Sequence, residues 1–162
     1  MRRKINSDGL LLCELQAKTF ELSCDLCKCS SEIFIRRFMN GEITEIIDDE
    51  SIIMTTLQSR DVIAEIENQY GESEYGTIKF TKNEMYWIGY IYRYYCFTYG
   101  RSSKQAYRQI KPRELRDVYL PFHTLSPENA IERILEAKGL PVSEEDELRW
   151  QLDTLIKFRK IK

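Results

Sequence analysis

Four cysteines near the start of the chain are the residues whose types and spacing come closest to a metal site. Cys24, Cys27 and Cys29 form a C-x2-C-x-C cluster, and Cys13 would supply a fourth thiolate for zinc. Structural zinc sites usually pair two short knuckles across a loop, whereas Cys13 falls on a predicted helix before the cluster. We therefore expect no metal and no cofactor, and we expect these cysteines and Cys96 to be reduced, ordinary side chains.

A single histidine and scattered carboxylates offer little for catalysis. His123 lies in YLPFHTLSPE, with no neighbouring residue that would complete a catalytic triad or a metal motif. The chain lacks the GxxxxGK[ST], GxGxxG, GxSxG and HExxH patterns, so the sequence contains no standard phosphate-binding loop or nucleophile elbow. We predict that the protein is not an enzyme and that His123 hydrogen-bonds a turn between two helices.

Two arginine-containing segments are candidates for contact with nucleic acid or another anion. Arg36 and Arg37 precede a turn at 40–41 with the spacing of a helix-turn-helix, and a second basic set, which includes Arg108 and Arg113, follows the aromatic run. The helix after the turn would read the DNA, but it is acidic and lacks the side chains that bind base edges. Arginines that brace buried tyrosine hydroxyls would produce the second set equally well. A DNA-binding regulator with a degenerate helix-turn-helix is therefore the alternative function.

Two surfaces are candidates for contact with a second protein. An acidic edge without a basic residue is formed by Glu42, Glu45, Asp48, Asp49 and Glu50. Near the C-terminus, an apolar stripe is formed by Leu148, Leu152, Leu155 and Ile156. Trp150 lies about 200° from this stripe at about 100° per residue. Either a loop of its own chain covers Trp150, or this residue anchors a protein partner or a second copy in a homodimer.

The element that should organise the fold is the run MYWIGYIYRYYCFTY between Met85 and Tyr99. Nearly every position is aromatic or apolar, which leaves no face for solvent, so we predict a helix surrounded by protein. Thr81 and Glu84 have the spacing of a capping box, and Gly100 is a natural C-terminal stop. These signals set the predicted helix at residues 81–99.

Apolar residues at spacings of three and four predict further helices on both sides of this run. They cover about residues 8–26, 32–40, 56–70, 102–110, 126–138 and 143 to the C-terminus, with shorter helical segments near 42–51 and 114–120. The stretch GTIKF is the one candidate for a short extended segment. The sequence therefore predicts an all-α fold, a single helical domain over 1–162, built as an irregular bundle of about seven helices around residues 81–99.

Composition indicates a cytoplasmic protein. The formal net charge is −2, from 24 Lys and Arg against 26 Asp and Glu, so no global field attracts nucleic acid or anionic lipid. The basic start followed by a leucine triplet resembles an export signal, but the apolar stretch is short and is followed by Glu14, so we expect none. The aromatic run falls short of about 20 apolar residues and contains Arg93, so we expect no membrane span.

Three stretches of the chain, FIRRFMN, MYWIGYIYRYYCFTY and SSKQAYRQIKPRELRDVYLPFHTLSPENAIERIL, fall within residues 33–135. They resemble stretches of small uncharacterised bacterial proteins, found mainly in Firmicutes and often encoded beside short toxin-like partners, including predicted ADP-ribosyltransferase-like ones. The resemblance implies an antitoxin-like or immunity-like role, in which the protein holds a partner enzyme inactive, and it carries no catalytic residue. We therefore expect a non-catalytic protein whose partner is a co-encoded toxin.

Overall fold

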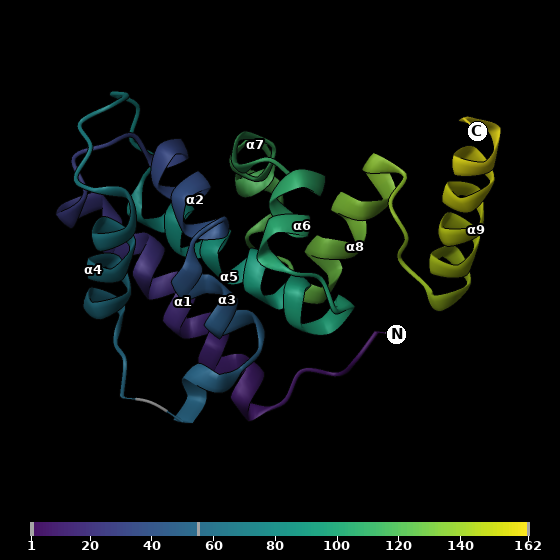
Figure 1. Cartoon of the computed structure of the whole chain (residues 1–162), viewed down its shortest axis with the longest axis horizontal. Helices are drawn as coiled ribbons and strands as arrows, with labels where there is room; N and C mark the ends of the chain where they lie inside the picture. The colour runs from purple at the N-terminus through teal and green to yellow at the C-terminus, as the bar shows by residue number, and fades with distance from the viewer. Residues whose placement is uncertain (1, 55, 162) are drawn as a thin grey trace.

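The computed structural model describes residues 2–54 and 56–161, and every regular element in these ranges is helical (Figure 1). The α-helices are α1 (Ser7–Leu26), α2 (Ser31–Met39), α3 (Glu42–Asp48), α4 (Ser59–Tyr70), α5 (Lys82–Tyr99), α6 (Ser103–Gln109), α7 (Pro112–Phe122), α8 (Pro127–Lys138) and α9 (Glu144–Ile161), and a 3-10 turn, η1 (Ser51–Met54), follows α3. The all-α prediction is confirmed over the described residues. They hold nine α-helices where we expected about seven, because the short segments α3 and α7 each form a separate helix.

The ends of α5 are set by local hydrogen bonds. The Glu84 N–H donates to Thr81 Oγ1 at 3.1 Å, and the Thr81 N–H donates to Glu84 Oε1 at 2.9 Å, which is the predicted capping box. Gly100 ends the helix with φ 65°, in the left-handed region that favours glycine. The aromatic run is therefore one uninterrupted helix.

Helices α1 and α5 pack along much of their lengths, and α5 also contacts α6, α7 and α8 (Figure 1). Their backbones approach closely at Gly89, where a Cβ atom would lie 2.9 Å from the Gln16 carbonyl oxygen and from the Phe20 ring. The Gln16 amide uses this proximity and donates to the Gly89 carbonyl at 3.1 Å. A side chain at position 89 would therefore force the two helices apart.

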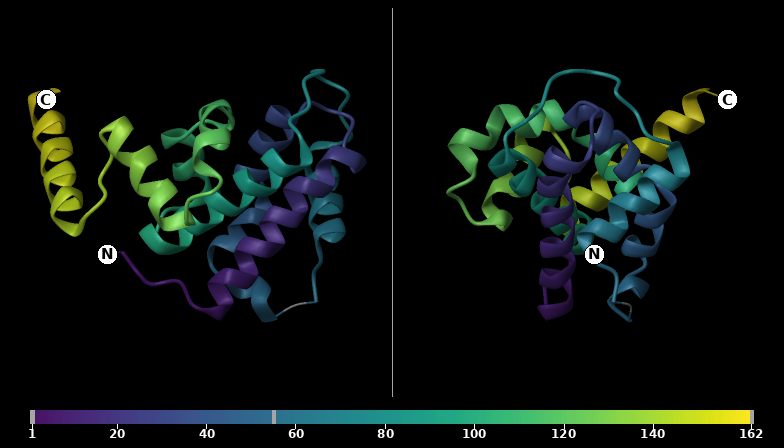
Figure 2. Two further views of the ribbon diagram at one scale, coloured as in Figure 1. Left: turned by 180° about the vertical axis from the view of Figure 1, so that it is seen from behind. Right: turned by 90° about the vertical axis from the view of Figure 1, so that its left-hand side faces the viewer.

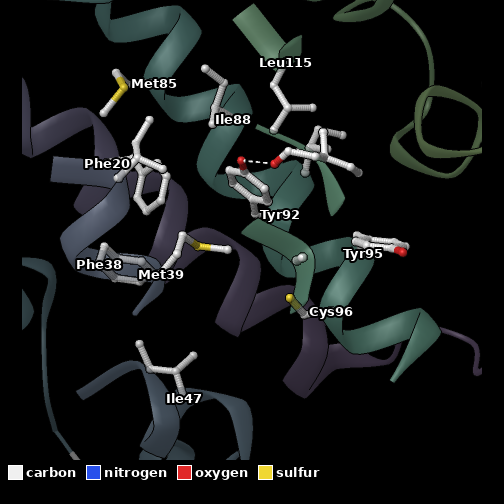
Figure 3. Packing of buried hydrophobic residues seen from close by; sticks show 14 of the residues in the cluster. Phe20, Phe38, Met39, Ile47, Met85, Ile88, Tyr92, Tyr95, Cys96 and Leu115 are labelled. Carbon is white, nitrogen blue, oxygen red and sulfur yellow. Dashed lines mark hydrogen bonds between the residues drawn. The ribbon is translucent and has the colours of Figure 1, made fainter. Parts of the chain in front are cut away.

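Aromatic rings fill the core between α1, α2 and α5 (Figure 3). Phe20 packs edge-on against Phe34 and Phe38, with ring centroids 5.6 Å and 4.9 Å away. The buried hydroxyl of Tyr92 donates to the Ile110 carbonyl at 2.5 Å. Burial of this α5 tyrosine therefore satisfies its polar group, as the sequence required.

One face of α5 is only half-buried, contrary to the expectation that protein surrounds the helix on every side. Tyr86, Trp87, Tyr90 and Tyr94 all keep partial exposure to solvent. Three of them, at i, i+4 and i+8, stack their rings in a row, with centroids 6.5 Å apart between Tyr86 and Tyr90 and 6.3 Å apart between Tyr90 and Tyr94. Trp87 contacts Tyr119 of α7, with ring centroids 5.7 Å apart, and the row of Tyr86, Tyr90 and Tyr94 remains partly open to solvent.

The loop between α4 and α5 runs beside the start of α2 without forming a strand in the described chain. The Ser30 N–H donates to the Tyr75 carbonyl at 3.0 Å, and the Ser31 N–H donates to the Ile78 carbonyl at 3.1 Å. The segment GTIKF is thus held beside the start of α2 by the bond between Ser31 and Ile78. None of the helices described is long and apolar enough to cross a membrane.

Candidate functional site

Helix α9 stands apart from the bundle formed by the other helices (Figures 1 and 2). It is 18 residues long, and it alone among the described helices contains no buried residue. Its first turn is capped locally, since the Asp146 N–H donates to Ser143 Oγ at 3.1 Å and the Ser143 N–H donates to Asp146 Oδ2 at 3.3 Å. The helix therefore forms through its own sequence signals, without burial against the bundle.

A mostly buried ion pair joins the first turn of α9 to Arg101, which follows α5. Arg101 donates from Nη2 to Glu147 Oε2 at 2.5 Å, and both side chains are mostly buried. A cavity of about 250 Å³ lies beside this contact, lined by Tyr99 and Leu148 among others. The Tyr99 hydroxyl is buried there without a hydrogen-bond partner among the described residues. The ion pair holds the first turns of α9 beside Arg101, and the rest of the helix projects.

The apolar residues of α9 face solvent. Those of the predicted stripe remain 50–63% exposed, and Phe158 is 65% exposed. The sequence predicted this stripe on one side of the last helix and Trp150 on the other. The structure leaves both sides open, and Trp150 is 40% exposed. Neither a loop nor another helix of the described chain buries Trp150.

The acidic edge is not a uniform row of solvated carboxylates. Glu42, Glu45 and Asp49 are exposed, whereas the Asp48 side chain points into the protein and is only 19% exposed. Glu45 forms an ion pair with Lys104, with Oε1 and Nζ 3.3 Å apart, and Glu50 forms an ion pair with Arg3. Because α3 belongs to the bundle and α9 stands apart from it, the structure does not bring the acidic edge and Trp150 together (Figure 1).

Asp48 belongs to a buried polar network that the sequence pattern did not predict. Arg93, 2% exposed in the middle of α5, donates to Asp48 Oδ1, to Gln16 Oε1 and to Ser103 Oγ, each at 2.8 Å. The Ser103 N–H also donates to Asp48 Oδ2 at 3.0 Å. The network thus joins α1, α3, α5 and α6. Its one sequence signal was an arginine inside an otherwise aromatic run.

The four arginines considered for nucleic-acid binding do not form one surface of free cations. Arg37 donates to the Gly71 carbonyl at 2.7 Å and is half-buried, and Arg113 pairs with Glu32 at 3.2 Å. Arg36 and Arg108 are exposed and form no ion pair with the residues described. Next to them, the helix expected to read DNA presents acidic side chains to solvent, so the α2–α3 pair does not have the charge of a helix-turn-helix reader.

The five cysteines are free thiols, and Cys13, Cys27, Cys29 and Cys96 are buried. Burial raises the pKa of the Cys13 and Cys27 thiols to about 12 and that of Cys96 to about 11, which keeps them protonated near neutral pH. Among the described residues, no group of three or more His, Cys, Asp and Glu side chains is placed to hold a metal ion.

His123 lies at the end of α7, where its ring is engaged by its own helix. The ring stacks on Tyr119 with centroids 4.5 Å apart, and Nδ1 lies 2.9 Å from the Tyr119 carbonyl oxygen. The histidine therefore contacts the last turn of its own helix.

Comparison of the chain with protein-family models, with curated proteins and with solved structures finds no match.

Proposed function

We propose that the protein is a non-catalytic binding protein that neutralises a co-encoded bacterial toxin by direct contact, in the manner of an antitoxin or immunity protein. The resemblance of residues 33–135 to proteins encoded beside toxin-like partners supplies the class of partner. The structure contributes the observation that carries the proposal. Trp150 lies on a helix that contains no buried residue, and 40% of its surface is open to solvent.

Trp150 is suited to anchor such a contact. Its indole is a large, stiff apolar surface that loses little conformational freedom on binding, and tryptophans are over-represented among residues that dominate interface energies. Ile161 lies about 20° around the helix from it, at about 100° per residue, and is 83% exposed. The expected partner surface is therefore an apolar pocket that admits the indole ring.

The acidic edge serves as a second, electrostatic contact in this proposal. Glu42, Glu45 and Asp49 are exposed on or next to α3, and such carboxylates steer a basic partner and speed its association. Asp48 is not part of this surface because Arg93 and Ser103 occupy its carboxylate. The proposed site of action is the cytoplasm, where the free cysteines stay reduced.

Co-expression with the product of the neighbouring gene tests the proposal. The tagged protein should retain that product through affinity and size-exclusion chromatography, and it should abolish the toxicity of the product in cells. If the two proteins separate and toxicity persists, the proposal is wrong. The DNA-binding alternative makes a different prediction: binding to duplex DNA that weakens steeply with salt and is lost when Arg36 and Arg108 are both changed to Ala.

A further inference from the structure

The stripe of α9 is an apolar helix face that is at least half exposed at every position, although Leu148 at its start also lines the cavity beside Tyr99. It consists of Leu148, Leu152, Leu155 and Ile156, which lie within about 100° of the helix circumference at about 100° per residue. This is the width of the face that a helix normally buries. Soluble monomers seldom leave a continuous apolar surface open, so the stripe calls for an occupant.

The charges of α9 are separated along its length, and this separation indicates what kind of surface would fit the stripe. The first turn carries Glu144, Glu145, Asp146 and Glu147, and the last turn carries Arg159 and Lys160. Counted from Leu148, Glu145 and Arg159 lie at about 60° and 20° around the helix, in line with the stripe. The apolar face therefore begins acidic and ends basic, so it is complementary to a reversed copy of itself.

We propose that the stripe of α9 binds the stripe of a second copy of this chain, antiparallel and about a two-fold axis near Leu152. In this arrangement Leu148 meets Ile156 of the second copy, and Glu145 meets Arg159 of the second copy. By symmetry each contact occurs twice, as in any isologous interface. A parallel pair would instead set acidic turn against acidic turn and basic against basic, which opposes it.

The Glu145 side chain is exposed enough to form this intermolecular ion pair. Glu145 accepts from Arg149 of its own helix at 3.2 Å, but the two side chains are 83% and 67% exposed, so the contact is weak and exchangeable. An 18-residue helix is about 27 Å long, and one pair of such helices buries less surface than a permanent dimer. The dimer should therefore be reversible. Trp150 lies on the reverse side of α9 and stays outside this interface.

Sedimentation velocity on the full chain over a range of concentrations tests the dimer. The sedimentation coefficient should rise from the monomer value toward that of a dimer as concentration increases. Leu152→Glu places two carboxylates at the two-fold axis and should keep the protein monomeric, whereas Thr154→Glu, on another side of α9, should leave the association unchanged. Circular dichroism checks that both variants keep their helix content. A monomer at every concentration, or a dimer indifferent to Leu152→Glu, would overturn the proposal.

A charge-swap experiment tests the antiparallel arrangement. Glu145→Lys and Arg159→Glu should each weaken self-association about tenfold, since each variant converts two attractive contacts into repulsive ones. When the two variants are mixed, both contacts of the heterodimer become attractive again, so association should return to the wild-type strength. A mixture no stronger than the single variants would show that α9 does not pair in this way. The measurement needs no toxin, so its outcome is independent of the function proposed above.

Discussion

Arg93 of α5 and Asp48 of α3 form an ion pair, with Nη1 and Oδ1 2.8 Å apart, inside a network that also holds Gln16 and Ser103. The arginine side chain is 3% exposed. A buried guanidinium needs hydrogen-bond acceptors, and each of the three nitrogens of Arg93 donates to a different side chain here. The pair therefore fixes how α3 and α6 sit against the aromatic helix.

Replacing Asp48 should destabilise the fold severely. Asp48→Ala leaves a buried cation without its counter-ion and should lower the free energy of unfolding by about 3–5 kcal/mol. Urea denaturation followed by circular dichroism measures the loss. The neighbouring exposed residue provides the matched control, because Asp49→Ala should change stability by only about 0.5 kcal/mol. Equal effects of the two variants would mean that the network does not hold the helices together.

Truncating Trp150 should weaken partner binding without affecting the fold. Because Trp150 is 40% exposed on a helix without buried residues, Trp150→Ala should leave the melting temperature nearly unchanged, while the complex with the co-encoded protein loses about 2 kcal/mol, chiefly through faster dissociation. Surface plasmon resonance measures the dissociation rate. Gln151→Ala, about 100° around the helix from Trp150, is the control. A lower melting temperature with unchanged binding would place Trp150 in the protein's own core.

Stability should fall in acid partly through Glu84. Burial alone would raise the pKa of Glu84, but hydrogen bonds from Thr81 and Arg116 hold this pKa below its ordinary value of 4.5. The carboxylate therefore contributes stability that is present above about pH 4.5 and is lost as the pH falls through the lower folded-state pKa. In the Glu84→Gln variant, the urea midpoint should depend less on pH below about pH 4.5 than in the wild type. An unchanged dependence on pH would show that Glu84 does not contribute to the loss of stability in acid.

Thiol labelling should distinguish the half-buried cysteine from the buried ones. Native protein treated with iodoacetamide at pH 8 should react first at Cys24, because the thiols of Cys13 and Cys27 are buried and burial raises their pKa to about 12. Mass spectrometry of the digested protein locates the label. Denatured protein should react at all five cysteines, which controls for reagent access. Rapid native labelling of Cys13 would mean that the α1–α5 interface opens.

Sequence alone determined the features that depend on neighbours in the chain. The boundaries of α5 follow from Thr81, Glu84 and Gly100, and the start of α8 follows from Ser126, whose Oγ accepts from the Asn129 N–H at 3.2 Å. Each of these signals acts within one helical turn, where residue type decides which backbone groups are satisfied. The all-α fold class was predictable for the same reason.

Only the tertiary structure decided which faces of these helices are covered. Periodicity shows that a face is apolar, but the covering element comes from elsewhere in the chain, so the open stripe of α9 and the half-exposed tyrosines of α5 could not be predicted. The same holds for Asp48, which looked like one of several equal carboxylates until Arg93, 45 residues later in the chain, was found beside it. Contacts between distant residues depend on how helices pack, and packing depends on all of the helices together.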